Sequence, residues 1–143
     1  MLPFCEIPVS SPRPKIIRIP FEPKTIGEHI RKKRLERELL QSDVAKLIGV
    51  STDCITYWEN NRSYPQIQFM PAIIKFLGFF PLAIDDSSLG GQILTFRNEN
   101  GLSHKKLGNI LGVDASTVSD WEKRRRFPND NMFKEIDRLI GIL

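Results

Sequence analysis

A sixteen-residue segment occurs twice in this chain with the same framework, and this repeat limits the folds open to it. VSTDCITYWENNRSYP runs from Val50 to Pro65, and VDASTVSDWEKRRRFP runs from Val113 to Pro128, 63 positions later. The same register can be extended backwards as far as Gly27 and Gly90. A shared framework with different polar residues between is typical of two copies of one fold. The identical pairs include Gly27/Gly90, Ile30/Ile93, Arg34/Arg97, Glu36/Glu99, Leu39/Leu102, Gly49/Gly112, Val50/Val113, Trp58/Trp121, Glu59/Glu122 and Pro65/Pro128.

The apolar positions of the two copies also correspond. At most of the remaining inward positions, an apolar residue of the first copy is replaced by a different apolar residue in the second. We expect these side chains, with the two tryptophans, to point inward and form the cores of two domains. The pairs are Val44/Leu107, Leu47/Ile110, Ile48/Leu111, Ile55/Val118 and Tyr64/Phe127.

Apolar spacing and capping residues predict helices throughout both copies. In the first copy, a basic amphipathic helix reaches from 26 to 38, and a short second helix ends at Gly49, which suits a left-handed C-cap. Ser51 is a suitable N-cap for a third helix over 52–60. A fourth helix lies between 67 and 77, and Pro71 is expected to shorten or kink it. In the second copy, Asp86, Ser87 or Ser88 caps the first of four helices, which are predicted near 89–99, 104–111, 115–125 and 130–140.

The fold class is therefore all-α, with two tandem small helical domains. We place an N-terminal tail at 1–23, the first domain at 24–80, a linker at 81–87 and the second domain at 88–143. Each domain has only about sixty residues, near the lower limit for independent stability. We therefore expect the domains to dock, through the apolar segment around Phe76–Leu82. The basic tail is either an arm that reaches a nucleic-acid groove or a strap on the first domain.

Composition and charge exclude several classes of protein. The net charge of +4 favours polyanionic partners. Cys5 and Cys54 are too few for a disulfide framework, and together with His29 and His104 they lack the close spacing of a zinc site. The sequence shows no membrane-length apolar run, no signal peptide, no Gly-rich phosphate loop and no nucleophile motif. We expect a cytoplasmic protein that is not an enzyme and uses no cofactor or metal.

Two short helices joined by a Gly-centred turn form a helix-turn-helix arrangement. The major groove of B-DNA admits one α-helix, and the N-terminal residues of that helix meet the base edges. Such a helix needs an apolar brace on one side, which Ile55 and Trp58 supply, and polar groups on the other. The outward residues are predicted to be Thr52, Asp53, Thr56 and Tyr57 in the first copy and Ala115, Ser116, Ser119 and Asp120 in the second.

LLQSDVAKLIGVSTDCITYWENNRSYP and LSHKKLGNILGVDASTVSDWEKRRRFP resemble the Xre/Cro-type, lambda repressor-like helix-turn-helix family. The resemblance covers about residues 24–80 and 88–143 and implies a regulator of bacterial or phage origin, such as a repressor. It implies that Gln41 contacts the DNA backbone and flanking bases. It further implies that Thr52, Asp53 and Tyr57 read bases, and that the segment after the third helix touches phosphates. The candidate DNA-binding residues of the first copy are Gln41, Ser51, Thr52, Asp53, Thr56, Tyr57, Asn60, Asn61 and Arg62.

Both copies depart from the family pattern. In the first, Leu40 replaces the usual serine N-cap. In the second, His104 replaces the glutamine, and Ala115 and Asp120 fill two base-reading positions, whereas the run Lys123–Arg126 is suited to neutralising phosphates. The first copy is the more typical DNA reader. The candidate DNA-binding residues of the second copy are His104, Lys105, Ala115, Ser116, Ser119, Asp120, Arg124 and Arg125.

Two functions fit these features. The first is a sequence-specific regulator that binds double-stranded DNA, either as a monomer with two unlike half-sites or as a homodimer. The second is an antitoxin-like or coactivator-like adaptor, whose protein partner binds the apolar segment 69–84. The net charge, Gln41 and Arg62 favour the first function. The second copy is either a DNA reader or a docking module.

Overall fold

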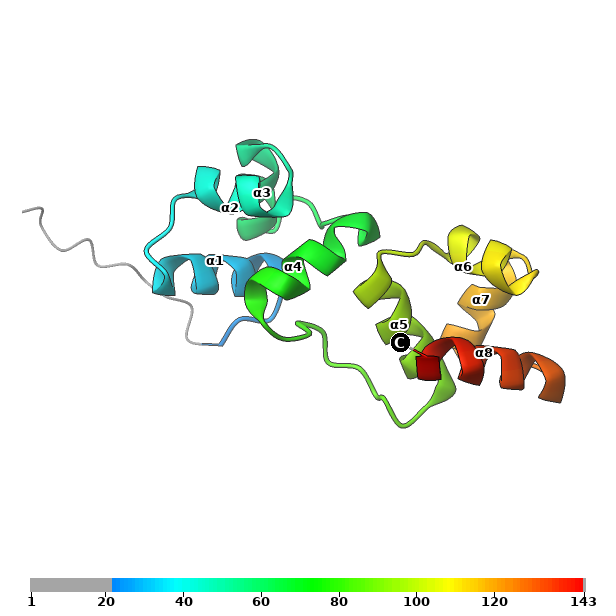
Figure 1. Cartoon of the computed structure of the whole chain (residues 1–143). Helices are drawn as coiled ribbons and strands as arrows, with labels where there is room; N and C mark the ends of the chain where they lie inside the picture. The colour runs from blue at the N-terminus through cyan, green and yellow to red at the C-terminus, as the bar shows by residue number, and fades with distance from the viewer. Residues whose placement is uncertain (1–21, 143) are drawn as a thin grey trace, which may run out of the picture.

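A computed structural model of the chain describes residues 22–142, and within that range every regular element is helical (Figure 1). The predicted all-α fold is confirmed. The predicted role of the N-terminal tail, as an arm or a strap, concerns residues that lie almost entirely outside the described range. The domain limits stay predictions. The first repeat contains α1 (Ile26–Glu36), α2 (Gln41–Ile48), α3 (Thr52–Glu59), the 3₁₀ helix η2 (Ile67–Phe69) and α4 (Met70–Leu77). The second contains α5 (Leu89–Asn100), α6 (His104–Leu111), α7 (Ala115–Glu122) and α8 (Asp130–Ile142).

Left-handed residues end several helices earlier than the sequence predicted. α1 ends at Glu36 because Glu38 has a φ of 56°. α3 and α7 end at Glu59 and Glu122, and a left-handed residue follows two positions later in each case: Asn61 with φ 57° and Arg124 with φ 59°. The predicted extension of the third helix of repeat two to residue 125 is therefore wrong.

The fourth α-helix is shorter than the predicted span 67–77, because residues 67–69 form η2 and α4 begins only at Met70. Of the two effects expected of Pro71, the shortened helix is observed and a kink is not. Pro71 occupies the first turn of α4, directly after η2. The backbone N–H that proline lacks would have had no partner within the helix at this position, so proline is well tolerated there. The predicted N-cap Ser88 is confirmed, because its hydroxyl accepts the N–H of Gly91 at the start of α5.

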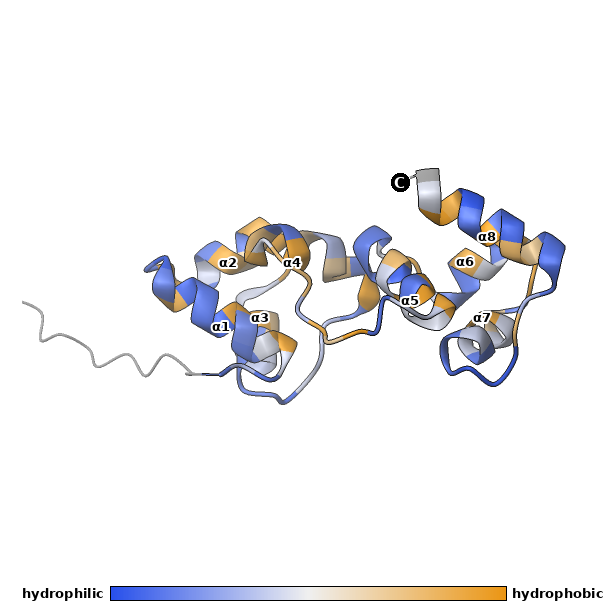
Figure 2. Cartoon of the chain, turned by 90° about the horizontal axis from the view of Figure 1, so that it is seen from below, coloured by the Kyte–Doolittle hydropathy of each residue, from blue (hydrophilic) through white to orange (hydrophobic). Residues whose placement is uncertain are grey.

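Each repeat has its own core, which lies between its helices (Figure 2). Trp58 and Trp121 are buried, as predicted. The first core contains Ile30, Val44, Ala45, Ile48, Ile55, Trp58, Met70, Ile73, Phe76 and Leu77. The second contains Ile93, Phe96, Leu107, Val118, Trp121 and Ile136.

Four apolar residues that were predicted to point inward are exposed. The exposed fractions are 60% for Leu47, 55% for Ile110, 70% for Tyr64 and 78% for Phe127. The eight-residue helices α2 and α6 bury only one narrow stripe each, and Leu47 and Ile110 lie beside that stripe. Tyr64 and Phe127 lie in the loops after the third helices, beyond the reach of the cores.

The two repeats are in contact through η2 and α4 on one side and α5 on the other. At the end of α5, Gly101 approaches the first repeat so closely that a Cβ there would lie 3.2 Å from Cγ of Pro71 and 3.4 Å from the carbonyl oxygen of Gln68. This contact lies N-terminal to the Phe76–Leu82 segment that the sequence analysis proposed for docking. α5 therefore serves both as the first helix of repeat two and as a cover for α4.

None of the helices between residues 22 and 142 combines the length and apolar character needed to cross a membrane.

Candidate nucleic-acid interface

The turn between the second and third helices has the same construction in both repeats. Gly49 and Gly112 adopt left-handed conformations, with φ values of 87° and 73°, and end α2 and α6. A residue without a Cβ adopts this conformation at little cost. Ser51 then caps α3, and its hydroxyl accepts the N–H of Cys54 at 3.4 Å. Both predicted caps of the first repeat, Gly49 and Ser51, are confirmed.

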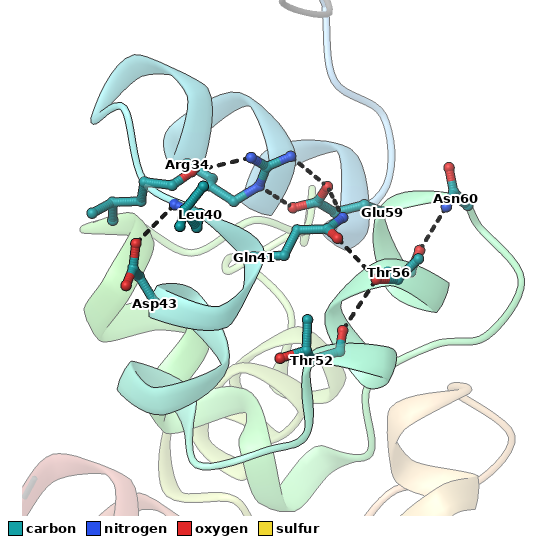
Figure 3. Close-up of polar contacts among 9 residues, drawn as sticks. Arg34, Leu40, Gln41, Asp43, Thr52, Thr56, Glu59 and Asn60 are labelled. Atoms are coloured by element: carbon teal, nitrogen blue, oxygen red, sulfur yellow. Dashed lines mark hydrogen bonds and ion pairs between the residues drawn. The ribbon is translucent and has the colours of Figure 1, made fainter.

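A buried charged pair joins α1 to α3. The guanidinium group of Arg34 donates to both carboxylate oxygens of Glu59, at 2.7 Å from Nε and 2.9 Å from Nη2 (Figure 3). Its Nη1 also donates to the carbonyl oxygen of Leu39 at 3.1 Å. Only 13% of the Arg34 side chain and 3% of the Glu59 side chain are exposed. Arg34 therefore holds the recognition helix in place and does not belong to a solvated basic face of α1.

Gln41, the first residue of α2, completes this network. Its Nε2 donates to Oε2 of Glu59 at 3.0 Å, and its Oε1 accepts the hydroxyl of Thr56 at 2.9 Å. Figure 3 shows the amide of Gln41 between these two α3 residues. Both ends of the amide are thereby fixed, and the side chain is oriented before any ligand arrives. The remaining amide hydrogen is still available to a phosphate oxygen, and the remaining carbonyl lone pair to a hydrogen-bond donor.

Thr56 does not point outward as the sequence analysis predicted. Its hydroxyl donates to Gln41 and also approaches the carbonyl oxygen of Thr52 at 3.2 Å, and the residue is half-buried. The other candidates on α3 are accessible: Ser51, Thr52, Asp53 and Tyr57 are all exposed. Their role as base readers stays a prediction.

The loop after α3 divides its polar residues between two roles. Asn61 is tied to the start of α1, since its Nδ2 donates to Glu28 at 3.1 Å and its Oδ1 accepts the hydroxyl of Thr25 at 2.7 Å. The backbone N–H of Lys24 and the amide of Asn61 hold the pKa of Glu28 below its ordinary value. Arg62 is exposed and forms no ion pair with any other described residue, so its charge is available to a ligand. Asn60, also exposed, donates to the carbonyl oxygen of Thr56 at 2.9 Å.

The second repeat reproduces the buried charged pair with one substitution. Arg97 on α5 binds both carboxylate oxygens of Glu122 on α7, with Nη2 at 3.1 Å from Oε2, and donates to the carbonyl oxygen of Leu102 at 2.9 Å. His104 takes the place of Gln41, and its Nε2 lies 2.8 Å from Oε2 of Glu122. The contact to the buried glutamate is thus preserved although the amide is replaced by an imidazole, whereas the contact that Gln41 makes with Thr56 has no counterpart from His104.

The outward face of α7 offers fewer polar groups than that of α3. Ser116 is exposed, whereas Ala115, Ser119 and Asp120 are half-buried. Asp120 lies 3.6 Å from Arg126, which forms a weak ion pair with it. The basic residues around α7 are more accessible than those polar groups, because Lys105 and Arg125 are exposed and form no ion pair within residues 22–142.

Arg124 is partly committed to the linker. Its Nη2 donates to Oδ2 of Asp85 at 2.9 Å. Hydrogen bonds from Ser87 and from Arg124 hold the pKa of Asp85 below its ordinary value. Arg124 occupies the position that Asn61 has in the first repeat. Asn61 connects the loop after α3 to the start of α1, and Arg124 connects the loop after α7 to the segment just before α5.

Comparison with known proteins agrees with this geometry. The family model described as helix-turn-helix matches the chain twice, over residues 30–83 and 93–142. The chain belongs to the helix-turn-helix family. Each match contains one of the Arg–Glu pairs and one complete helix-turn-helix unit.

Two curated proteins are similar to parts of this chain. The chain is 29% identical over 86 residues to "HTH-type transcriptional activator BcrR" of Enterococcus faecalis, an alignment that covers 59% of this chain and 41% of that protein. It is 32% identical over 57 residues to "Putative multi-protein-binding factor 1" of Yarrowia lipolytica, covering 40% of this chain and 38% of that protein. The chain therefore spans less than half the length of either relative. No solved structure gives a significant match.

Sequence reasoning missed the role of the two buried charged pairs of this helix-turn-helix chain. The signal was present, because Arg34 and Glu59 recur as Arg97 and Glu122 at the 63-residue spacing. The recurrence of an arginine and a glutamate as a pair of opposite charge was compatible with a structural contact, although Glu36/Glu99 and Arg62/Arg125 are also identical in both copies and are exposed. The basic run that precedes Arg34 masked this reading, since it made the arginine look like part of a solvated face.

Proposed function

We propose that this chain is a sequence-specific transcription regulator that binds double-stranded DNA through the recognition helices α3 and α7. The observation that supports this most strongly is the construction of the first repeat. A buried charged pair fixes α3 and Gln41, while the N-terminal face of α3 carries the exposed residues Thr52, Asp53 and Tyr57. DNA as the ligand also implies a cytoplasmic, nucleoid-associated location.

The two repeats are proposed to read unlike half-sites. α3 presents hydroxyl, carboxylate and phenol groups, and the carboxylate of Asp53 can accept a hydrogen bond from the N4 amino group of cytosine. α7 presents mainly Ser116 and is followed by accessible cations, so it would contribute more to affinity than to base discrimination. The site of one chain should accordingly be asymmetric, with its two halves about 34–36 Å apart.

The exposed arginines that follow the recognition helices are expected to act on all DNA sequences equally. Arg62→Ala and Arg125→Ala should each weaken binding uniformly and reduce the slope of log K against log salt by roughly one, because each removes one phosphate contact. Titrations at several salt concentrations measure this slope. Lys134→Ala, on the exposed surface of α8, is the control and should leave the slope unchanged. A change in base preference with either arginine variant would contradict the phosphate assignment.

The exposed residues of α3 should instead determine which bases are preferred. Thr52→Ala and Tyr57→Ala are expected to weaken binding by roughly 1–3 kcal/mol for each base that the variant no longer reads, and to alter the selected sequence. DNA selection with the wild type and both variants, repeated at two salt concentrations, measures this directly. Lys134→Ala, on the exposed surface of α8, serves as the control and should leave the selected sequence unchanged. An unchanged preference in both variants would overturn the assignment of α3 as the recognition helix.

The contribution of the second repeat can be tested in the intact chain. Lys123→Ala combined with Arg125→Ala removes accessible cations next to α7 without touching either core. If both repeats bind DNA, the footprint should shorten by about one helical turn, roughly 10 base pairs. An unchanged footprint and salt slope would mean that only the first repeat binds DNA.

A second candidate function is an adaptor that connects other proteins. The relative named as a multi-protein-binding factor favours it. Segment 69–84 supports it less than the sequence predicted, because Met70, Ile73, Phe76 and Leu77 are buried in the first core, whereas Phe79 is exposed. If the selection experiment yields no preferred DNA sequence at either salt concentration, the adaptor function is favoured over the first.

A further inference from the structure

Each repeat carries a groove along its first helix. Groove one lies between α1 and Phe79, which follows the end of α4, and groove two lies between α5 and α8. Groove one has a volume of about 230 Å³ and is lined by Pro23, His29, Lys32, Lys33, Glu36 and Phe79. Groove two has a volume of about 390 Å³, and its lining includes Asp86, Phe96, Glu99, Asp137 and Ile140. Residues 23, 33 and 36 of groove one correspond to 86, 96 and 99 of groove two at the 63-residue spacing. The two grooves are therefore equivalent surfaces of the two repeats.

The charge of this surface is reversed between the repeats. Groove one is lined by two lysines and one glutamate, whereas groove two has three carboxylates and no cation in its lining. None of these charged side chains forms an ion pair with any residue between 22 and 142. Groove one thus offers two unpaired cations, which groove two lacks, and groove two has an excess of unpaired carboxylates.

The apolar parts of the two grooves also complement each other. Phe79 at the edge of groove one is 46% exposed, and His29 contacts its ring edge-on at a centroid distance of 5.3 Å. The apolar lining of groove two includes Ile140, which is half-buried, and the exposed edge of Phe96, a residue of the second core that is 5% exposed. An exposed aromatic ring surrounded by lysines suits an apolar groove surrounded by carboxylates.

We propose that groove one of one chain binds groove two of a second copy, with the Phe79 ring against Phe96 and Ile140 and the lysines facing the carboxylates. The two grooves lie near opposite ends of the linker, because Phe79 of groove one precedes the linker and Asp86 of groove two lies near its end. Figure 1 shows the linker passing below the two repeats. Two chains related by a two-fold axis would make this contact twice and form a closed dimer. Neither groove includes a residue of α3 or α7, so both recognition helices stay free.

Charge reversal tests the proposal without DNA. Sedimentation equilibrium of the intact wild-type chain should show a dimer that weakens as salt is raised. The variant Lys32→Glu/Lys33→Glu has two acidic grooves, and Glu99→Lys/Asp137→Lys has two basic-edged ones. Because like charges would then face each other, each variant alone should dimerise at least about tenfold more weakly than the wild type. Lys46→Glu makes a like change on the exposed surface of α2, outside both grooves, and should behave as the wild type.

Mixing the two double variants gives the decisive result. A heterodimer pairs each acidic groove with a basic one, so association should return although each variant alone is monomeric. This recovery also shows that neither variant has simply misfolded. The proposal is overturned if the wild type is monomeric at all concentrations, if reversal leaves the dimer unchanged, or if mixing fails to restore it. None of these outcomes depends on whether the chain binds DNA.

Discussion

Glu59→Ala is expected to lower the free energy of unfolding of the first repeat by about 3–5 kcal/mol. The substitution leaves the guanidinium group of Arg34 buried without its carboxylate partner and removes the acceptor of the Gln41 amide. An unpaired buried charge is costly because neither water nor another protein group replaces the missing partner. Urea denaturation followed by tryptophan fluorescence measures the change, with Trp58 as the reporter in the first core.

Two matched variants test whether the charged pair is responsible. Glu36→Ala changes an exposed glutamate on α1 and should alter stability by no more than about 0.5 kcal/mol. Glu122→Ala breaks the equivalent pair in the second repeat and should cost a similar amount to Glu59→Ala. Equal stability of Glu59→Ala and Glu36→Ala would show that the pair contributes nothing, contrary to its burial.

The same variant should impair DNA binding beyond its effect on folding. The folded Glu59→Ala protein lacks the carboxylate that orients Gln41 and, through Gln41, Thr56. The proposed contact of Gln41 with the DNA backbone is then no longer preorganised. A titration well below the unfolding midpoint, compared with the Glu36→Ala control, separates this effect from unfolding. Unchanged affinity would remove Gln41 from the proposed interface.

The sequence predicted the fold well because the features that specify it are local. Gly49 and Gly112 required left-handed conformations, Ser51 was recognisable as an N-cap, and Trp58 and Trp121 lay on the inward side of their helices. Each of these signals depends on neighbours within one or two turns. The 63-residue repeat then gave two independent observations of the same pattern.

The incorrect predictions about side-chain direction concern contacts between residues distant in sequence, whereas the wrong end of the third helix in repeat two has a local cause, the left-handed Arg124. The side chain of Thr56 is turned towards Gln41, fifteen residues earlier, and no helical periodicity indicates that. Leu47 and Ile110 were assigned to the cores because both copies have an apolar residue there, yet similarity between copies does not show which way a side chain points. The reversed charge of the two grooves was likewise hidden until the helices were placed against each other.

Gly27→Ala is expected to destabilise the first repeat by about 3 kcal/mol or more. Gly27 lies where α1 crosses the end of α3, and a Cβ at this position would overlap the carbonyl group of Trp58. Because the overlapping atoms are backbone, no side chain can rotate away, and α1 must separate from α3. The identity of Gly27 and Gly90 in the two copies follows from this crossing and not from helix propensity, since glycine within a helix is itself unfavourable.

The equivalent glycines provide a graded series for this test. At Gly90 the added Cβ would lie 2.8 Å from the carbonyl oxygens of Trp121 and Glu122, so a smaller cost of about 1–3 kcal/mol is expected. At Gly141 nothing lies within 4 Å, and alanine should be neutral or stabilise by up to about 1 kcal/mol. Urea denaturation of the three variants should rank them Gly27, Gly90, Gly141 in decreasing order of cost. If Gly27→Ala were as stable as Gly141→Ala, the close crossing of α1 over α3 would be refuted, and with it the rigid placement of the recognition helix on which the proposed base contacts depend.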